Sequence, residues 1–147
     1  MCPVPERSPA DPYNLDRFMK AQAGIFPQVL SELQAGRKTS HWMWFIFPQI
    51  RGLGRSPTAI EYAISGLDEA RSYLQHPVLG PRLEQCTRLV LAVEGRSVEQ
   101  IFGSPDDMKF KSCMTLFAKA SPGNEMFLNA LQKYFNGSGD HLTLDRL

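Results

Sequence analysis

The sequence lacks most of the features that identify a function directly. It has only three cysteines, with no CxxC pair and no neighbouring histidine, which excludes a disulfide framework and argues against a zinc site. No apolar run approaches the roughly 18 residues of a membrane-spanning helix, so no contact with a membrane is predicted. The net charge of +1 gives no general attraction for nucleic acid. These absences favour a cytoplasmic protein with reduced thiols.

The first residues differ in composition from the rest of the chain. Residues 1–13 hold prolines at positions 3, 5, 9 and 12 and lack the apolar stretch of a signal peptide, which predicts a flexible, proline-rich arm. Residues 14–147 are then predicted to form a single helical domain. The chain is 43% apolar and 21% charged, which is typical of a globular protein that buries a core without a metal ion or another cofactor.

Signals for the starts and ends of helices recur throughout this domain. Ser56 followed by Pro57 is typical of a helix N-terminus, and Ser97 begins a capping box. Pro27 falls inside the first apolar helical stripe, where it removes a backbone hydrogen bond, so a kink or break is expected between Gly24 and Pro27. The pattern predicts an all-α fold, a single compact multi-helical domain of roughly six to eight mostly short helices.

The segment HWMWFIF at residues 41–47 is apolar on every side once it is wound into a helix. A helix of this kind must be surrounded by protein, so it is predicted to be a central aromatic helix, capped by Ser40 and ended by Pro48. A strand is the alternative, but no other segment offers a convincing pairing partner. We expect Trp42, Trp44 or both to be largely buried.

Side chains suited to catalysis are scattered. His41, His76 and His141 stand apart, each next to a predicted helix boundary, and none has a sequence partner that resembles a nucleophile–base pair. Cys86 and Cys113 fall on inward faces of their helices, which predicts buried free thiols rather than nucleophiles. The helix that contains Cys113 is predicted to expose its outer face to solvent. That face carries Lys111, Ser112, Thr115 and Lys119. No catalytic residue is predicted, and the sequence favours a binding protein over an enzyme.

A patch of cations surrounds the aromatic helix. Between Glu32 and Glu61 there is no acid, while four lysines and arginines lie there. Cations beside aromatic rings suit a phosphate or a nucleobase. Gln22 falls in the middle of the apolar face of the first helix, where its amide either bonds a neighbouring backbone group or faces a pocket. The candidate ligand-binding residues are Gln22, His41, Trp44, Gln49, Arg51 and Arg55.

Three functions fit these residues. The first is a binding module for a small anionic or nucleotide-like ligand near residues 41–56, in which Gln22, His41 and Arg51 converge on one polar pocket. The second is a hydrolase or transferase that acts on a phosphorylated substrate, with His41 as acid or base. The third is a structural or protein-interaction domain without a ligand, in which the tryptophans belong to the core and the arginines are solvated. The oligomeric state is not indicated by the sequence.

Several longer segments carry a resemblance to known proteins. They are SHWMWFIFPQ at residues 40–49, GLGRS at residues 52–56, HPVLG at residues 76–80 and SCMTLF at residues 112–117. In these segments the chain resembles the small bacterial and fungal proteins called domain of unknown function 1810, and the likeness covers nearly the whole chain after the proline-rich arm. The resemblance implies an all-helical fold and no established activity.

Members of that family are sometimes labelled calpastatin. A calpain inhibitor of that type is expected to be long, repetitive and disordered, whereas this chain is short, has no internal repeat and can form a core. The label is therefore not carried over to this protein.

Overall fold

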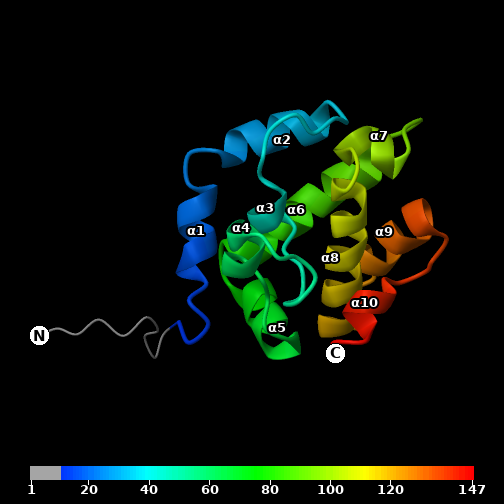
Figure 1. Ribbon diagram of the computed structural model, residues 1–147. Coiled ribbons are helices and arrows are strands. Elements are labelled where there is room, and N and C mark those ends of the chain that lie inside the picture. Colours follow the sequence, from blue (N-terminus) through cyan, green and yellow to red (C-terminus); the bar gives the residue numbers. More distant parts are fainter. Residues whose placement is uncertain (1–10) are drawn as a thin grey trace, which may run out of the picture.

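The structure is a computed structural model that describes residues 11–147, and within this range the chain is all-α, as the sequence predicts (Figure 1). The ten helices are α1 (Asp16–Gln22), α2 (Phe26–Gln34), α3 (Met43–Ile46), α4 (Pro57–Glu61), α5 (Leu67–Gln75), α6 (Leu79–Ala92), α7 (Val98–Phe102), α8 (Asp106–Ala120), α9 (Met126–Phe135) and α10 (His141–Leu144). They outnumber the six to eight expected because several are only one or two turns long. In the described range, none is long and apolar enough to cross a membrane. The arm expected at residues 1–13 lies almost entirely outside the described residues, and the domain boundary stays a prediction.

Helix α8 lies at the centre of the bundle. It packs against α5, α7, α9 and α10, while α6 packs against α2, α5 and α9. Nine of the 15 residues of α8 are buried, and they include Ser112 and Thr115. The expectation of a solvated face was wrong for Ser112 and Thr115, whereas Lys119 is exposed as expected. Helix α10 packs against α8, and the backbone nitrogen of Asp140 donates a hydrogen bond to the Thr115 hydroxyl at 2.9 Å.

The break between α1 and α2 confirms the effect expected of Gly24 and Pro27. Gly24 has a φ of +80°, a left-handed conformation that glycine adopts without strain. Pro27, however, lies in the first turn of α2 rather than inside a longer helix. A proline in the first turn removes no intrahelical hydrogen bond, so it begins α2 instead of bending it.

Three helix caps are present, and two of them, at Ser56 and Ser97, are predicted above. The Ser56 hydroxyl accepts from the backbone of α4, Ser97 and Gln100 form a complete capping box on α7, and the Asp140 carboxylate caps α10. These caps satisfy backbone N–H groups that the first turn of a helix leaves without a partner.

The aromatic segment is buried but shorter than predicted. Helix α3 is a single turn, because Phe47 precedes a proline and leaves the helical conformation. Trp42 is 1% exposed and confirms the expectation of a buried tryptophan, whereas Trp44 is half-buried. Cys86 and Cys113 are buried free thiols, which confirms that prediction as well.

Candidate ligand-binding site

The loop that leads into α3 is held by Glu32, a buried carboxylate on α2. Its Oε1 accepts hydrogen bonds from the backbone nitrogens of Thr39 (2.7 Å) and Ser40 (3.0 Å) and from Nε1 of Trp42 (3.0 Å). Its Oε2 accepts from the Ser40 hydroxyl (2.6 Å) and from Gln28 (2.9 Å). Ser40 therefore does not cap α3 as expected, because its hydroxyl is directed toward Glu32.

Glu32 is ionised over a wide pH range. Burial alone would raise the pKa of its carboxyl group, but the hydrogen bonds from Ser40, Thr39, Gln28 and Trp42 outweigh burial and lower the pKa to about 2. The fixed negative charge orders the chain that enters α3, and α3 in turn positions Trp44.

After α3, residues 51–63 form a loop whose two ends lie side by side; we call it the 51–63 loop. Two backbone hydrogen bonds of 2.8 Å join Gln49 and Arg51 to Ile64. The loop contains α4, and at Gly54 a Cβ atom would lie 2.5 Å from a side chain of that helix. A larger residue at Gly54 would therefore force the loop away from α4.

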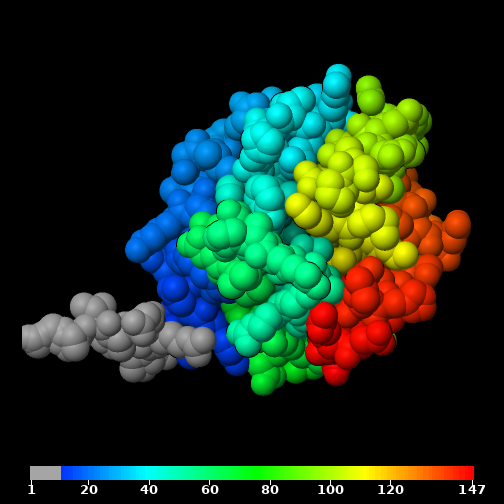
Figure 2. Space-filling view, viewed as in Figure 1, coloured from blue at the N-terminus to red at the C-terminus, as the bar shows by residue number. Residues whose placement is uncertain are grey.

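A cavity of about 460 Å³ lies between the 51–63 loop and α8; we call it the Trp44 cavity. Its lining includes Trp44, Gln49, Arg55, Met108, Lys109, Asp140 and Leu142. The first three come from α3 and the chain after it, and the others come from α8 and the segment around α10. Figure 2 shows that the 51–63 loop in blue-green, the start of α8 in yellow and the C-terminal segment in red meet on one face.

The apolar part of this lining is partly open to solvent. Met108 is 47% exposed and Leu142 is 60% exposed, and both are among the large apolar side chains that the fold leaves outside the core. Exposed apolar side chains that gather around a concave surface are typical of binding sites.

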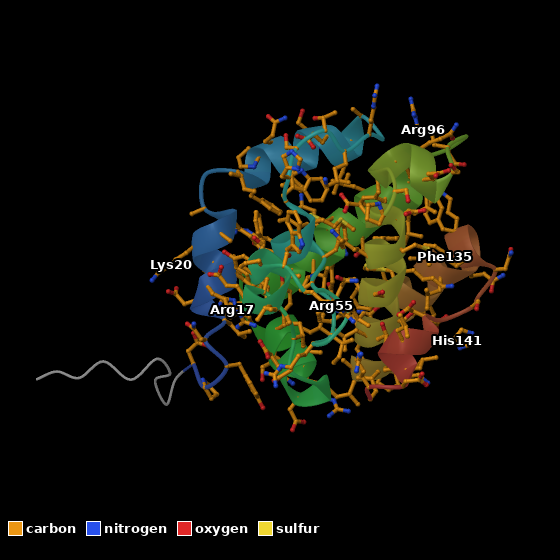
Figure 3. All side chains as sticks on the ribbon, viewed as in Figure 1. Arg17, Lys20, Arg55, Arg96, Phe135 and His141 are labelled. Atoms are coloured by element: carbon orange, nitrogen blue, oxygen red, sulfur yellow. The ribbon has the colours of Figure 1, made fainter. Side chains whose placement is uncertain are left out.

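The polar side chains of the Trp44 cavity fall into two groups. Lys109 is engaged within the protein, because its ammonium group lies 4.5 Å from the centre of the Trp44 ring and 3.2 Å from an Asp106 carboxylate oxygen. Arg55 and Gln49, by contrast, have side chains that make no hydrogen bond or ion pair with any residue from 11 to 147. Arg55 lies on the 51–63 loop, near the middle of the face seen in Figure 3. Its charge is available to a ligand.

The structure brings together three of the six candidate residues, namely Trp44, Gln49 and Arg55. Gln22 is 1% exposed, and its amide donates to the carbonyl oxygen of Phe45 at 2.8 Å and accepts from Arg82 at 3.1 Å. The first bond fits the interpretation that Gln22 binds a neighbouring backbone group, and it links α1 to α3.

The other two candidates do not join this group. His41 is exposed and does not line the Trp44 cavity. Arg51 is exposed beside a separate cavity of about 260 Å³ that Arg17 and Glu69 also line. The expected convergence of Gln22, His41 and Arg51 on one pocket is not seen, because the Gln22 amide is bonded to Phe45 and Arg82 in the interior, while Arg51 lies beside Arg17 near the start of α1.

Sequence reasoning missed the far side of the cavity. Neither Lys109 nor Asp140 was assigned a role in binding. No local pattern connects these residues to Trp44, since they lie more than 60 residues further along the chain. Among the described residues, no group of three His, Cys, Asp or Glu side chains is arranged to hold a metal ion.

Comparisons with known proteins agree with the sequence resemblance. A family model described as "Protein of unknown function (DUF1810)" matches residues 12–147. A solved structure, that of the conserved hypothetical protein Rv1873 from Mycobacterium tuberculosis, is 56% identical in sequence and superposes with a TM-score of 0.92. The alignment covers 93% of this chain and 98% of that one. A search of curated proteins gives no match.

Proposed function

Because this chain belongs to the DUF1810 family, whose description names no activity, we propose a function from its own residues: it binds a small anionic, nucleotide-like ligand in the Trp44 cavity. The observation that carries the proposal is Arg55, a cation that lines the cavity and has no partner among residues 11–147. A guanidinium group binds phosphate oxygens with two parallel hydrogen bonds, which makes phosphate a natural partner for it.

The remaining lining suits the rest of such a ligand. A volume of about 460 Å³ lies within the range of roughly 300–1,000 Å³ that small-molecule sites have. Trp44, Met108 and Leu142 supply apolar surface for a flat ring, and Trp44 adds an aromatic edge or face. Gln49 presents a donor and an acceptor in one amide group, which is the pattern that recognises the edge of a nucleobase.

The alternative functions have less support. A hydrolase or transferase that uses His41 needs this side chain beside the substrate, and His41 lies outside the lining of the Trp44 cavity. A domain without a ligand leaves the free Arg55 and the exposed Met108 and Leu142 around one cavity without a role.

A thermal-shift measurement tests the proposal. We expect at least one of the four common ribonucleoside 5′-monophosphates to raise the melting temperature by several degrees, because a ligand at about 100 times its dissociation constant adds about 2.7 kcal/mol. Arg55→Ala should abolish this rise and leave the melting temperature without ligand nearly unchanged, since Arg55 makes no hydrogen bond or ion pair within residues 11–147.

The matched control is Arg88→Ala, which removes an exposed arginine on α6 that does not line the cavity. This variant should respond to the nucleotide as the parent does. The proposal is wrong if no nucleotide shifts the melting temperature of the parent, or if Arg55→Ala and Arg88→Ala respond equally.

A further inference from the structure

Asp140 contributes to the Trp44 cavity a carboxylate group whose position is fixed by hydrogen bonds. Its Oδ2 accepts from the backbone nitrogen (3.0 Å) and from the hydroxyl (2.7 Å) of Thr143. Its own backbone nitrogen donates to the hydroxyl of Thr115, which is 2% exposed. These bonds fix the carboxylate, while its Oδ1 accepts no hydrogen bond from the residues that the structure describes.

Asp140 and Arg55 line the same cavity but do not neutralise each other. No ion pair within 4.0 Å joins them in the described chain, and the other cation of the cavity, Lys109, pairs with Asp106 instead. The cavity therefore presents one free positive group and one half-engaged negative group at separate places.

This arrangement restricts the ligand. A carboxylate repels a phosphate group, so a ligand that carried only phosphate would lose affinity wherever it approached Asp140. A ligand that places a hydroxyl group there instead gains a charge-assisted hydrogen bond. Acidic side chains that receive a ribose hydroxyl are a general solution in nucleotide-binding sites.

We propose that Asp140 is the ribose-reading residue of the Trp44 cavity, so that the ligand class is ribonucleoside phosphates, with the phosphate on Arg55 and the ribose hydroxyls donating to Oδ1 of Asp140. This inference rests on the proposed function. It adds that inorganic phosphate and nucleotides without ribose hydroxyls are poor ligands. A site that accepts a hydrogen bond from a hydroxyl group discriminates against an analogue that lacks it, because the charge-assisted hydrogen bond is then lost.

The test compares ligands on the full chain. Isothermal titration calorimetry is carried out with the four ribonucleoside 5′-monophosphates, their 2′,3′-dideoxy counterparts and inorganic phosphate. We expect the ribonucleotide that binds to do so at least about tenfold more tightly than its dideoxy form. This comparison uses the unaltered protein, so it does not depend on the folding of any variant.

Two variants then identify the residue. Asp140→Asn keeps an oxygen that can cap α10 and removes the negative charge, so it should reduce the preference for the ribonucleotide to about threefold or less. Asp145→Asn, which changes an exposed acid at the other end of α10, should keep the preference of the parent.

The outcomes separate the two proposals. If none of the nucleotides binds, the proposed function fails and this inference fails with it. If ribonucleotides and dideoxynucleotides bind equally well, or if Asp140→Asn keeps the full preference, the function stands and the role of Asp140 is overturned.

Discussion

At the scale of single residues, Glu32 is ionised in the core without a cationic partner among the described residues. Five hydrogen-bond donors surround its two oxygens, and one of them is the buried indole N–H of Trp42, which has no other acceptor among the described residues. A buried charge is tolerated when hydrogen bonds replace its hydration, which is the case here. The folded state therefore stabilises the ionised form of Glu32.

This residue should make stability depend on pH. The pKa of Glu32 falls from about 4.5 to about 2 on folding, so its contribution is complete above pH 4.5 and is lost as the pH falls toward 2. At about 1.4 kcal/mol for each pH unit between the two values, the contribution is roughly 3 kcal/mol. Glu32→Gln should thus lower the free energy of unfolding by roughly that amount at pH 7. The difference in free energy of unfolding between the parent and this variant should become smaller below pH 4.

Urea unfolding of the parent and of the Glu32→Gln variant at pH 7, 4 and 3 measures this difference in free energy of unfolding. Glu125→Gln is the control, since Glu125 is exposed and its side chain does not cap α9. A gap between the Glu32→Gln variant and the parent that stays constant with pH would contradict the prediction.

At the scale of elements, Arg17 joins α1 to the rest of the bundle through five hydrogen bonds. All five N–H groups of its guanidinium donate at 2.7–2.9 Å: to the carbonyl oxygens of Tyr13, Asn14, Glu61 and Ala63, and to the Glu69 carboxylate. The Arg17 and Glu69 side chains are 14% and 4% exposed, so water does not replace these bonds. One side chain therefore joins α1 to the end of the 51–63 loop and to α5.

Arg17→Lys should be strongly destabilising although it keeps the charge. A lysine ammonium group has three N–H donors on one nitrogen, whereas the planar guanidinium group has five on three nitrogens. Several of the carbonyl groups that bind Arg17 would therefore lose their hydrogen-bond donor. We expect a loss of about 3 kcal/mol in urea unfolding. Lys20→Met, on the same helix, is the control: Figure 3 shows Lys20 pointing away from the bundle, and its side chain is 81% exposed.

The Lys20 ammonium group lies 3.3 Å from an Asp16 carboxylate oxygen, and both side chains are exposed. An ion pair on the surface is worth less than about 1 kcal/mol, so Lys20→Met should change stability little. A result in which Arg17→Lys and Lys20→Met are equally mild would mean that α1 is held by its apolar contacts instead.

At the scale of the whole molecule, the two inner thiols report on the integrity of the bundle. Cys86 on α6 and Cys113 on α8 are both fully buried. Burial raises the pKa of both thiols, that of Cys86 to about 12, so little reactive thiolate is present at pH 8 even if a reagent arrives.

A Cys2→Ser variant keeps only Cys86 and Cys113 as thiols. In this variant, a thiol reagent at pH 8 should modify the two cysteines at least about 1,000-fold more slowly in the native protein than in urea. The rate should increase in parallel with the unfolded fraction as urea is added. Rapid modification without denaturant, or a disulfide between the two, would show that the core opens in a way that the structure does not include.

How much of the molecule could be predicted follows from the range of the interactions involved. The break before Pro27 and the cap at Ser56 depend on residues a few positions apart, and the sequence predicts both. Ser40 has the same local pattern of a serine before a predicted helix, but its hydroxyl donates a hydrogen bond to Glu32 on α2 and caps no helix. The far side of the Trp44 cavity depends on how α8 and α10 meet the 51–63 loop. Only packing decides that, so Lys109 and Asp140 could not be assigned to the site.

The paired ends of the 51–63 loop have a consequence for how this fold can diversify. The chain enters and leaves the loop at Arg51 and Ile64, which are hydrogen-bonded to each other, so α3 and α5 keep their spacing whatever lies between. Lengthening such a closed segment costs little entropy. Residues 53–59, which form one wall of the cavity, can therefore be lengthened or replaced to give new ligand preferences, while Glu61 and Ala63 keep their hydrogen bonds to Arg17.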